Sequence, residues 1–169
     1  EENQFVTGFR DLAKTLPQPN AILCISAHWF TNGTKVTAME MPRTIHDFGG
    51  FPQELFEVQY PAKGSPELAT ITQELLAPTA VELNHHWGLD HGAWSVIKHL
   101  YPDADIPVIQ MSIDYTKSGQ YHFELAQKLS ALRSKGILIV GSGNIIHNLR
   151  LVDFRNINTD NYGFDWAFE

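Results

Sequence analysis

Three histidines in short, distinctive settings are the residues of this sequence best suited to metal chemistry. His28 ends an apolar run rich in β-branched residues, His91 opens a predicted helix, and His147 lies four residues after Gly143. Imidazoles brought to one end of a sheet can bind a divalent cation and leave coordination positions open for a reactant. Such an open site is typical of catalysis more often than of a structural metal.

Each of these histidines also has a structural interpretation, which the sequence leaves open. A histidine near the end of a strand is commonly a hydrogen-bonded structural residue. His91 could bond to a substrate or to oxygen, or pack beneath a neighbouring loop. His46 lies in a loop rich in glycine and aromatic residues, where it could touch a substrate or bond to nearby backbone. Asp47, the next residue, could orient His46.

The types of ligand restrict which metals could bind, but they do not identify a single metal. No cysteine joins these histidines as a ligand, because the single cysteine, Cys24, is expected within a buried strand, so a structural zinc finger is excluded. Imidazoles with a carboxylate or a third histidine suit either catalytic zinc or non-haem Fe(II). The segment 141–144, Gly-Ser-Gly-Asn, could instead cradle a phosphate, but it lacks the lysine of a P-loop.

Composition restricts the class of protein. With 169 residues, 43% of them hydrophobic, the chain is long enough for one domain with a substantial core. Its net charge of −7 disfavours nucleic acid and anionic membranes as partners, and no apolar stretch approaches the roughly 20 residues of a membrane helix. A single cysteine precludes an internal disulfide, which favours a cytoplasmic location. Because Cys24 lies among apolar residues of a predicted strand, we expect it to be buried and inert. The oligomeric state is open.

Periodic patterns predict alternating strands and helices. We expect helices over residues 1–16, 66–76, 91–101 and 119–135, and strands over 21–27, 34–39, 79–83, 106–113 and 137–140. The alternation predicts an α/β fold, a mostly parallel open sheet with helices on both faces. Ligands of such sheets bind at the carboxyl ends of the strands, after which His28 and His147 are expected to lie. The long segment 40–64 is predicted to be an ordered functional loop.

Four segments carry a more specific signal. They are AILCISAHW at 21–29, IHDFGGFP at 45–52, GLDHGAW at 88–94 and GSGNIIHN at 141–148. In this order they resemble the class III extradiol ring-cleaving dioxygenases, in particular the branch that opens the catechol ring of DOPA. The resemblance extends from the first predicted helix to about residue 150, which is nearly the whole chain.

The resemblance implies roles for four histidines. His28 matches a metal ligand of the family, and His147 matches a histidine that acts as metal ligand or as catalytic acid/base. His91 matches a pocket histidine that contacts substrate or bound oxygen. His46 lies in the matching loop and is expected to contact substrate. The implied cofactor is Fe(II), with Zn(II) as an alternative bound metal, and the implied partners are a catechol and O2.

Two family segments have no counterpart in this sequence. Members of the family carry an earlier His-Gly-Ser-Pro segment and a C-terminal Pro-x-x-Glu-His segment, each of which supplies a metal ligand. Neither occurs between Glu1 and Glu169. We therefore expect residues 1–169 to form a single catalytic domain that is incomplete at both ends.

The leading hypothesis is an extradiol dioxygenase that acts on a catechol such as DOPA. One alternative is a zinc-dependent hydrolase on the same scaffold, with metal-bound hydroxide as the nucleophile. Another alternative, from a different class, is a non-catalytic, Memo-like binding protein. The two enzymes are distinguishable because only the dioxygenase requires a redox-capable metal.

Overall fold

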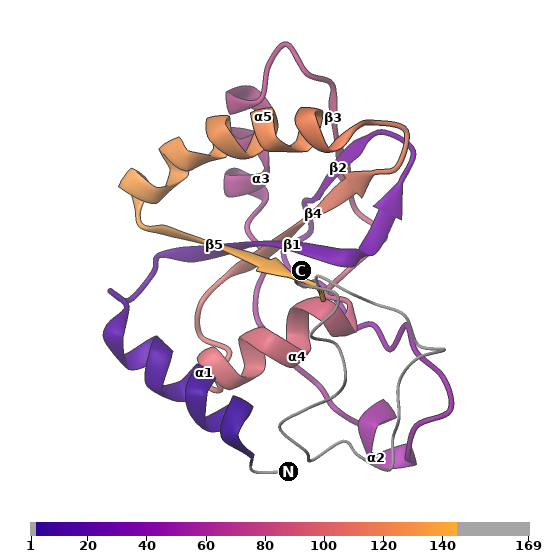
Figure 1. Ribbon diagram of the computed structural model, residues 1–169, viewed down its shortest axis with the longest axis vertical. Helices are drawn as coiled ribbons and strands as arrows, with labels where there is room; N and C mark the ends of the chain where they lie inside the picture. The colour runs from indigo at the N-terminus through magenta and orange to yellow at the C-terminus, as the bar shows by residue number, and fades with distance from the viewer. Residues whose placement is uncertain (1–2, 145–169) are drawn as a thin grey trace, which may run out of the picture.

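A computed structural model describes residues 3–144, and these form one five-stranded sheet between two layers of helices (Figure 1). The sheet order is β3-β2-β4-β1-β5. β1 pairs in parallel with β4 and β5, β2 pairs in parallel with β3, and only the β2–β4 pairing is antiparallel. The strands are β1 (Ala21–Thr31), β2 (Thr34–Thr37), β3 (Val81–Asn84), β4 (Val108–Asp114) and β5 (Ile137–Ser142). The predicted α/β fold with a mostly parallel sheet is confirmed.

Helices cover both faces of the sheet, as expected. In Figure 1, α3 and α5 lie on one side of the strands, and α1 and α4 lie on the other. Among residues 3–144, none of the helices combines the length and the apolar character that crossing a bilayer requires. The helices are α1 (Gln4–Thr15), α2 (Gln53–Phe56), α3 (Pro66–Leu75), α4 (His91–Leu100) and α5 (Gly119–Leu129), with a 3₁₀ helix, η1 (Ser130–Lys135), after α5.

β1 continues past the point where the sequence predicted its end. His28 was expected to follow the strand, but it lies within β1, in a stretch where the pairing with β4 shifts register between Ile25 and Phe30. Beyond the irregularity the strand resumes, and the hydroxyl groups of Thr31 and Ser112 of β4 are hydrogen-bonded at 2.7 Å. A strand irregularity of this kind commonly re-aims a side chain near a functional site.

The centre of β1 is buried on both faces, which explains its uninterrupted apolar sequence. Leu23 faces the core beneath α3 and α5, whereas Ile22 and Cys24 face the core beneath α4. Cys24 is fully buried, and burial, together with the nearby Asp90 carboxylate, raises the pKa of its thiol to about 12. The prediction that Cys24 is buried is confirmed, and a raised thiol pKa disfavours the reactive thiolate.

Asp90 links the start of α4 to the sheet. It is fully buried, and its Oδ1 atom accepts a hydrogen bond from the Ala93 backbone N–H at 3.0 Å, which caps the helix. Its Oδ2 atom accepts from the side-chain amide of Gln110 on β4, and Gln110 Oε1 accepts from the Asp90 backbone N–H at 3.2 Å. The first turn of α4 is thereby held at a defined position against β4.

Replacing Asp90 by alanine should lower the free energy of unfolding by about 2–4 kcal/mol, because the helix loses its cap and the buried Gln110 amide loses its acceptor. Urea denaturation followed by circular dichroism measures the change. Ser65 caps α3 through Leu68 at 3.1 Å but is only half-buried, so Ser65→Ala should cost about 1 kcal/mol. Equal losses in the two variants would contradict the special role of Asp90.

Candidate functional site

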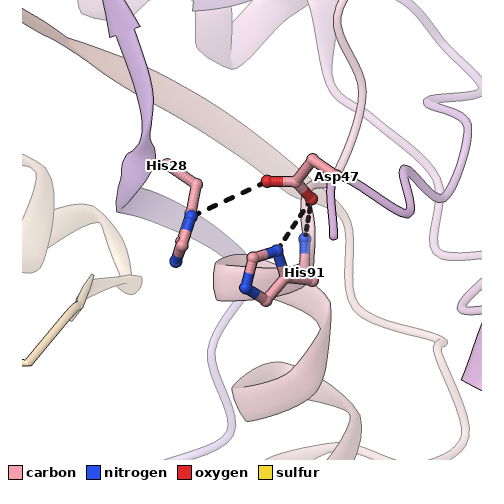
Figure 2. Close-up of side chains that lie close together, drawn as sticks. All are labelled: His28, Asp47 and His91. Carbon is pink, nitrogen blue, oxygen red and sulfur yellow. Dashed lines mark hydrogen bonds and ion pairs between the residues drawn. The ribbon is translucent and has the colours of Figure 1, made fainter. Parts of the chain in front are cut away.

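Three side chains from distant parts of the chain converge beside the first turn of α4. His28 comes from β1, Asp47 from the loop that precedes α2, and His91 from the first position of α4 (Figure 2). Each offers one ligand atom, and these atoms all lie within 4.8 Å of one another. Two imidazoles and a carboxylate form a set of donors that suits a divalent transition metal.

Asp47 contacts both histidines. Its Oδ1 atom accepts a hydrogen bond from the His91 backbone N–H at 2.8 Å and lies 2.9 Å from His91 Nδ1. Its Oδ2 atom lies 3.8 Å from His28 Nδ1, and the centroids of the two imidazole rings are 3.9 Å apart. Partial burial raises the pKa of the Asp47 carboxyl, but the backbone N–H and imidazole of His91 outweigh burial and hold it below its ordinary value.

A buried ring nitrogen of His91 lacks a well-aligned hydrogen bond. His91 Nδ1 is shielded from solvent, and its contact with Asp47 is not aligned as a hydrogen bond; among the described residues it has no other hydrogen-bond partner. Buried polar atoms are rarely left in this state unless a ligand, ion or water completes their environment. Both the geometry and the donor set of the cluster therefore fit a metal ion.

Small residues allow α4 to approach β1 and β5 closely. A Cβ atom on Gly92 would lie 2.8 Å from His28 Cδ2 and would overlap Ser26 Oγ. The Ser142 hydroxyl of β5 donates a hydrogen bond to the Gly92 carbonyl. Ser26 Oγ in turn accepts from the His28 backbone N–H at 3.2 Å. The small residues around His28 therefore make room for the helix that carries His91.

Two cavities share lining residues on the first two turns of α4. The first, here called the histidine cavity, has a volume of about 750 Å³ and is lined by His28, His91 and residues 141–144. The second, the aromatic pocket, has a volume of about 340 Å³. His91 and Ser95 line both. The aromatic pocket is lined by Phe48, Phe51, Leu55, Val58, His91, Trp94, Ser95, Lys98 and His99.

The structure brings only some of the predicted site residues together. His28 and His91 lie together, whereas His147 lies outside the described residues. His46 donates from Nε2 to the Val58 carbonyl at 2.8 Å, and its ring centroid lies 5.9 Å from those of Phe48 and Trp94. It therefore supports two walls of the aromatic pocket, and its contact with substrate stays a prediction.

The suggested pairing of Asp47 with His46 is wrong. His46 donates to the Val58 carbonyl, whereas Asp47 contacts the backbone N–H and Nδ1 of His91. Sequence reasoning also missed Ser95 and Lys98 as lining residues of the aromatic pocket. Their spacing could have indicated them, because residues four and seven positions after His91 lie on the same face of a helix as His91.

Replacing Gly92 by alanine should displace His28 and lower the free energy of unfolding by about 1–3 kcal/mol, since the added methyl group has no room between α4 and β1. Gly8, within α1, has open space within 4 Å of the position that a Cβ atom would take, so Gly8→Ala should instead stabilise the protein by about 0.5–1 kcal/mol. Chemical denaturation distinguishes the two directions. A stable Gly92→Ala variant would show that the close approach does not constrain the site.

Comparison with known proteins gives a consistent picture. Residues 2–168 match the family model described as the catalytic LigB subunit of aromatic ring-opening dioxygenase. The chain is 54% identical over 168 residues to the 4,5-DOPA dioxygenase extradiol of Escherichia coli, covering 99% of this chain and 61% of that protein. It is 46% identical over 133 residues to the protein of the same name from Beta vulgaris, covering 77% of this chain and 50% of that one.

A solved structure supports the same relationship. A crystal structure of an uncharacterized protein from Escherichia coli K12 superimposes with a TM-score of 0.77 and 50% sequence identity. The superposition covers 91% of this chain and 58% of that one. The chain thus spans between half and two thirds of the length of these relatives.

Proposed function

Because the chain belongs to the family of catalytic LigB subunits of aromatic ring-opening dioxygenases, we propose that the protein opens the ring of a catecholic substrate such as DOPA. The observation that carries the proposal is the convergence of His28, Asp47 and His91 beside an open cavity. The reaction would be extradiol cleavage, in which both atoms of O2 enter the product and a ring-opened semialdehyde forms.

Members of the family depend on a metal, and we propose Fe(II) as the active ion in this protein, with Zn(II) as an ion that binds in its place. His28 and His147 would hold the ion. When bound, it supplies Lewis acidity toward the catechol hydroxyls and redox access to O2. The structure places His28, the described member of this pair, beside a carboxylate and a second imidazole, and this polar setting supports a divalent ion at His28.

The protein side chains would bind the substrate and transfer protons. Asp47 orients His91 by accepting a hydrogen bond from its backbone N–H, and its carboxylate lies 2.9 Å from Nδ1, so Nε2 is the ring nitrogen that remains for a hydrogen bond to a ligand. His91 would donate that bond to the substrate or to oxygen in the histidine cavity. His147 would accept and return the catechol proton, a task for which an imidazole is well suited at neutral pH.

We further propose that residues 1–169 act as one catalytic domain in the cytoplasm, with a catechol and O2 as small-molecule partners. A single sheet joins the described residues into one unit, which supports the single domain. The lone cysteine is fully buried, which agrees with a reducing compartment.

Full-length protein reconstituted with Fe(II) under anaerobic conditions should consume O2 when DOPA or another catechol is added in air-saturated buffer, and a yellow semialdehyde should accumulate. The Zn(II) form should do neither, because zinc has no redox chemistry. An oxygen electrode and absorption spectroscopy measure both signals. Absence of oxygen uptake with every catechol would end the proposal, and hydrolysis of esters by the Zn(II) form would favour the hydrolase.

The roles of His28 and Asp47 can be separated by measuring metal content and turnover together. His28→Ala should lose the metal, because it removes a ligand. Asp47→Asn should keep the metal but lower kcat by about 10- to 100-fold, because the orientation of His91 is weakened.

Asp11→Asn is a suitable control, since Asp11 lies on α1 in an exposed ion pair with Lys14. It should change neither the metal content nor the turnover. Loss of the metal from Asp47→Asn to the same extent as from His28→Ala would make Asp47 a ligand and refute its assignment as an orienting residue.

A further inference from the structure

The aromatic pocket lies beside the site where the proposed reaction would occur, because His91 belongs to both. His91 and Ser95, one helical turn apart on α4, line both the histidine cavity and the aromatic pocket. A substrate ring bound next to His91 would therefore have its substituents directed past Ser95 into the aromatic pocket. The reacting part of the molecule and its side chain would lie on opposite sides of one turn of helix.

The part of the aromatic pocket around Phe48 and Trp94 is apolar, and Trp94 is buried. The Phe48 ring lies edge-on to His91 at 5.3 Å and edge-on to Phe51 at 5.5 Å. Trp94 is anchored through its Nε1 atom, which donates to the Ile45 carbonyl at 2.8 Å. Such walls suit a hydrocarbon chain and offer few hydrogen-bonding atoms to a polar one.

The charged side chain in the aromatic pocket is a cation. Lys98 is half-buried, and His99 lies next to it, while no carboxylate is found among the described residues that line the pocket. The chain as a whole carries a net charge of −7, so the positive charge of Lys98 is opposite in sign to that of the protein. Lys98 lies seven residues after His91, about 10 Å along the helix axis, which is the span of an aromatic ring with a short substituent.

We propose that the aromatic pocket receives the substrate's side chain and that Lys98 binds a carboxylate at its end, so that the protein selects catechols bearing an anionic side chain. The inference rests on the proposed function, because it assumes that the catechol ring lies beside His91. Lys98 determines specificity and takes no part in the chemistry. A catechol that carries an ammonium group and no carboxylate, such as dopamine, gains nothing from Lys98.

The test compares Lys98→Met with wild type on 3,4-dihydroxyphenylpropanoate and DOPA, which carry a carboxylate, and on dopamine, which does not. Loss of one charge-assisted hydrogen bond should raise KM for the two carboxylates about tenfold, with kcat nearly unchanged. KM for dopamine should change less than about twofold. Lys98→Arg should restore much of the preference, and Lys135→Met, at an exposed lysine in η1, should behave as wild type.

Calorimetric titration of the Zn(II)-loaded protein gives a second measurement that needs no turnover. Wild type should bind 3,4-dihydroxyphenylpropanoate more tightly than dopamine, and Lys98→Met should lose this difference. If no catechol is cleaved but the difference is present and depends on Lys98, the anion site stands and the dioxygenase proposal fails. Equal affinities in the wild type, or equal losses for all three ligands in Lys98→Met, would overturn the anion site.

Discussion

The buried carboxylate of Asp90 is the interaction on which the geometry of the site depends. It caps α4 through Ala93 and joins the helix to β4 through Gln110. The next residue in the chain is His91, and Gly92 then packs against His28 of β1. A buried acceptor that is fully engaged tolerates little movement, because every displacement leaves polar atoms without partners. The positions of the two histidines therefore follow from the anchoring of one helix end.

A single rigid helix relates the proposed reaction site to the pocket beside it. The first turn of α4 brings His91 to Asp47, and the following turns carry Ser95 and Lys98 along the wall of the aromatic pocket. Helical geometry sets the separation of these groups, so the distance between the reacting ring and an anionic substituent would be set by backbone rather than by flexible loops. Selectivity and chemistry would then share one structural element.

Several hydrogen bonds hold the segment between β2 and α3 in place. The Ile45 backbone N–H donates to the Leu89 carbonyl at 2.7 Å, and the Leu89 N–H donates to the Arg43 carbonyl at 2.9 Å. Gly88 has no space for a Cβ atom against Arg43. With the bond from His46 to Val58, these contacts present the residues that follow His46 to the site in an ordered arrangement, as the aromatic content of the segment had suggested.

The sequence by itself determined the α/β alternation and the buried strand around Cys24, and it singled out His28 and His91, which the structure brings together. The family match confirms the resemblance drawn from four short segments. These features depend on local periodicity or on motifs contiguous in the chain. Only the tertiary structure decided the antiparallel β2–β4 pairing, the contact of Asp47 with His91 rather than with His46, and the shared wall of two cavities. They depend on distances between segments far apart in the chain, which packing sets and local patterns do not encode.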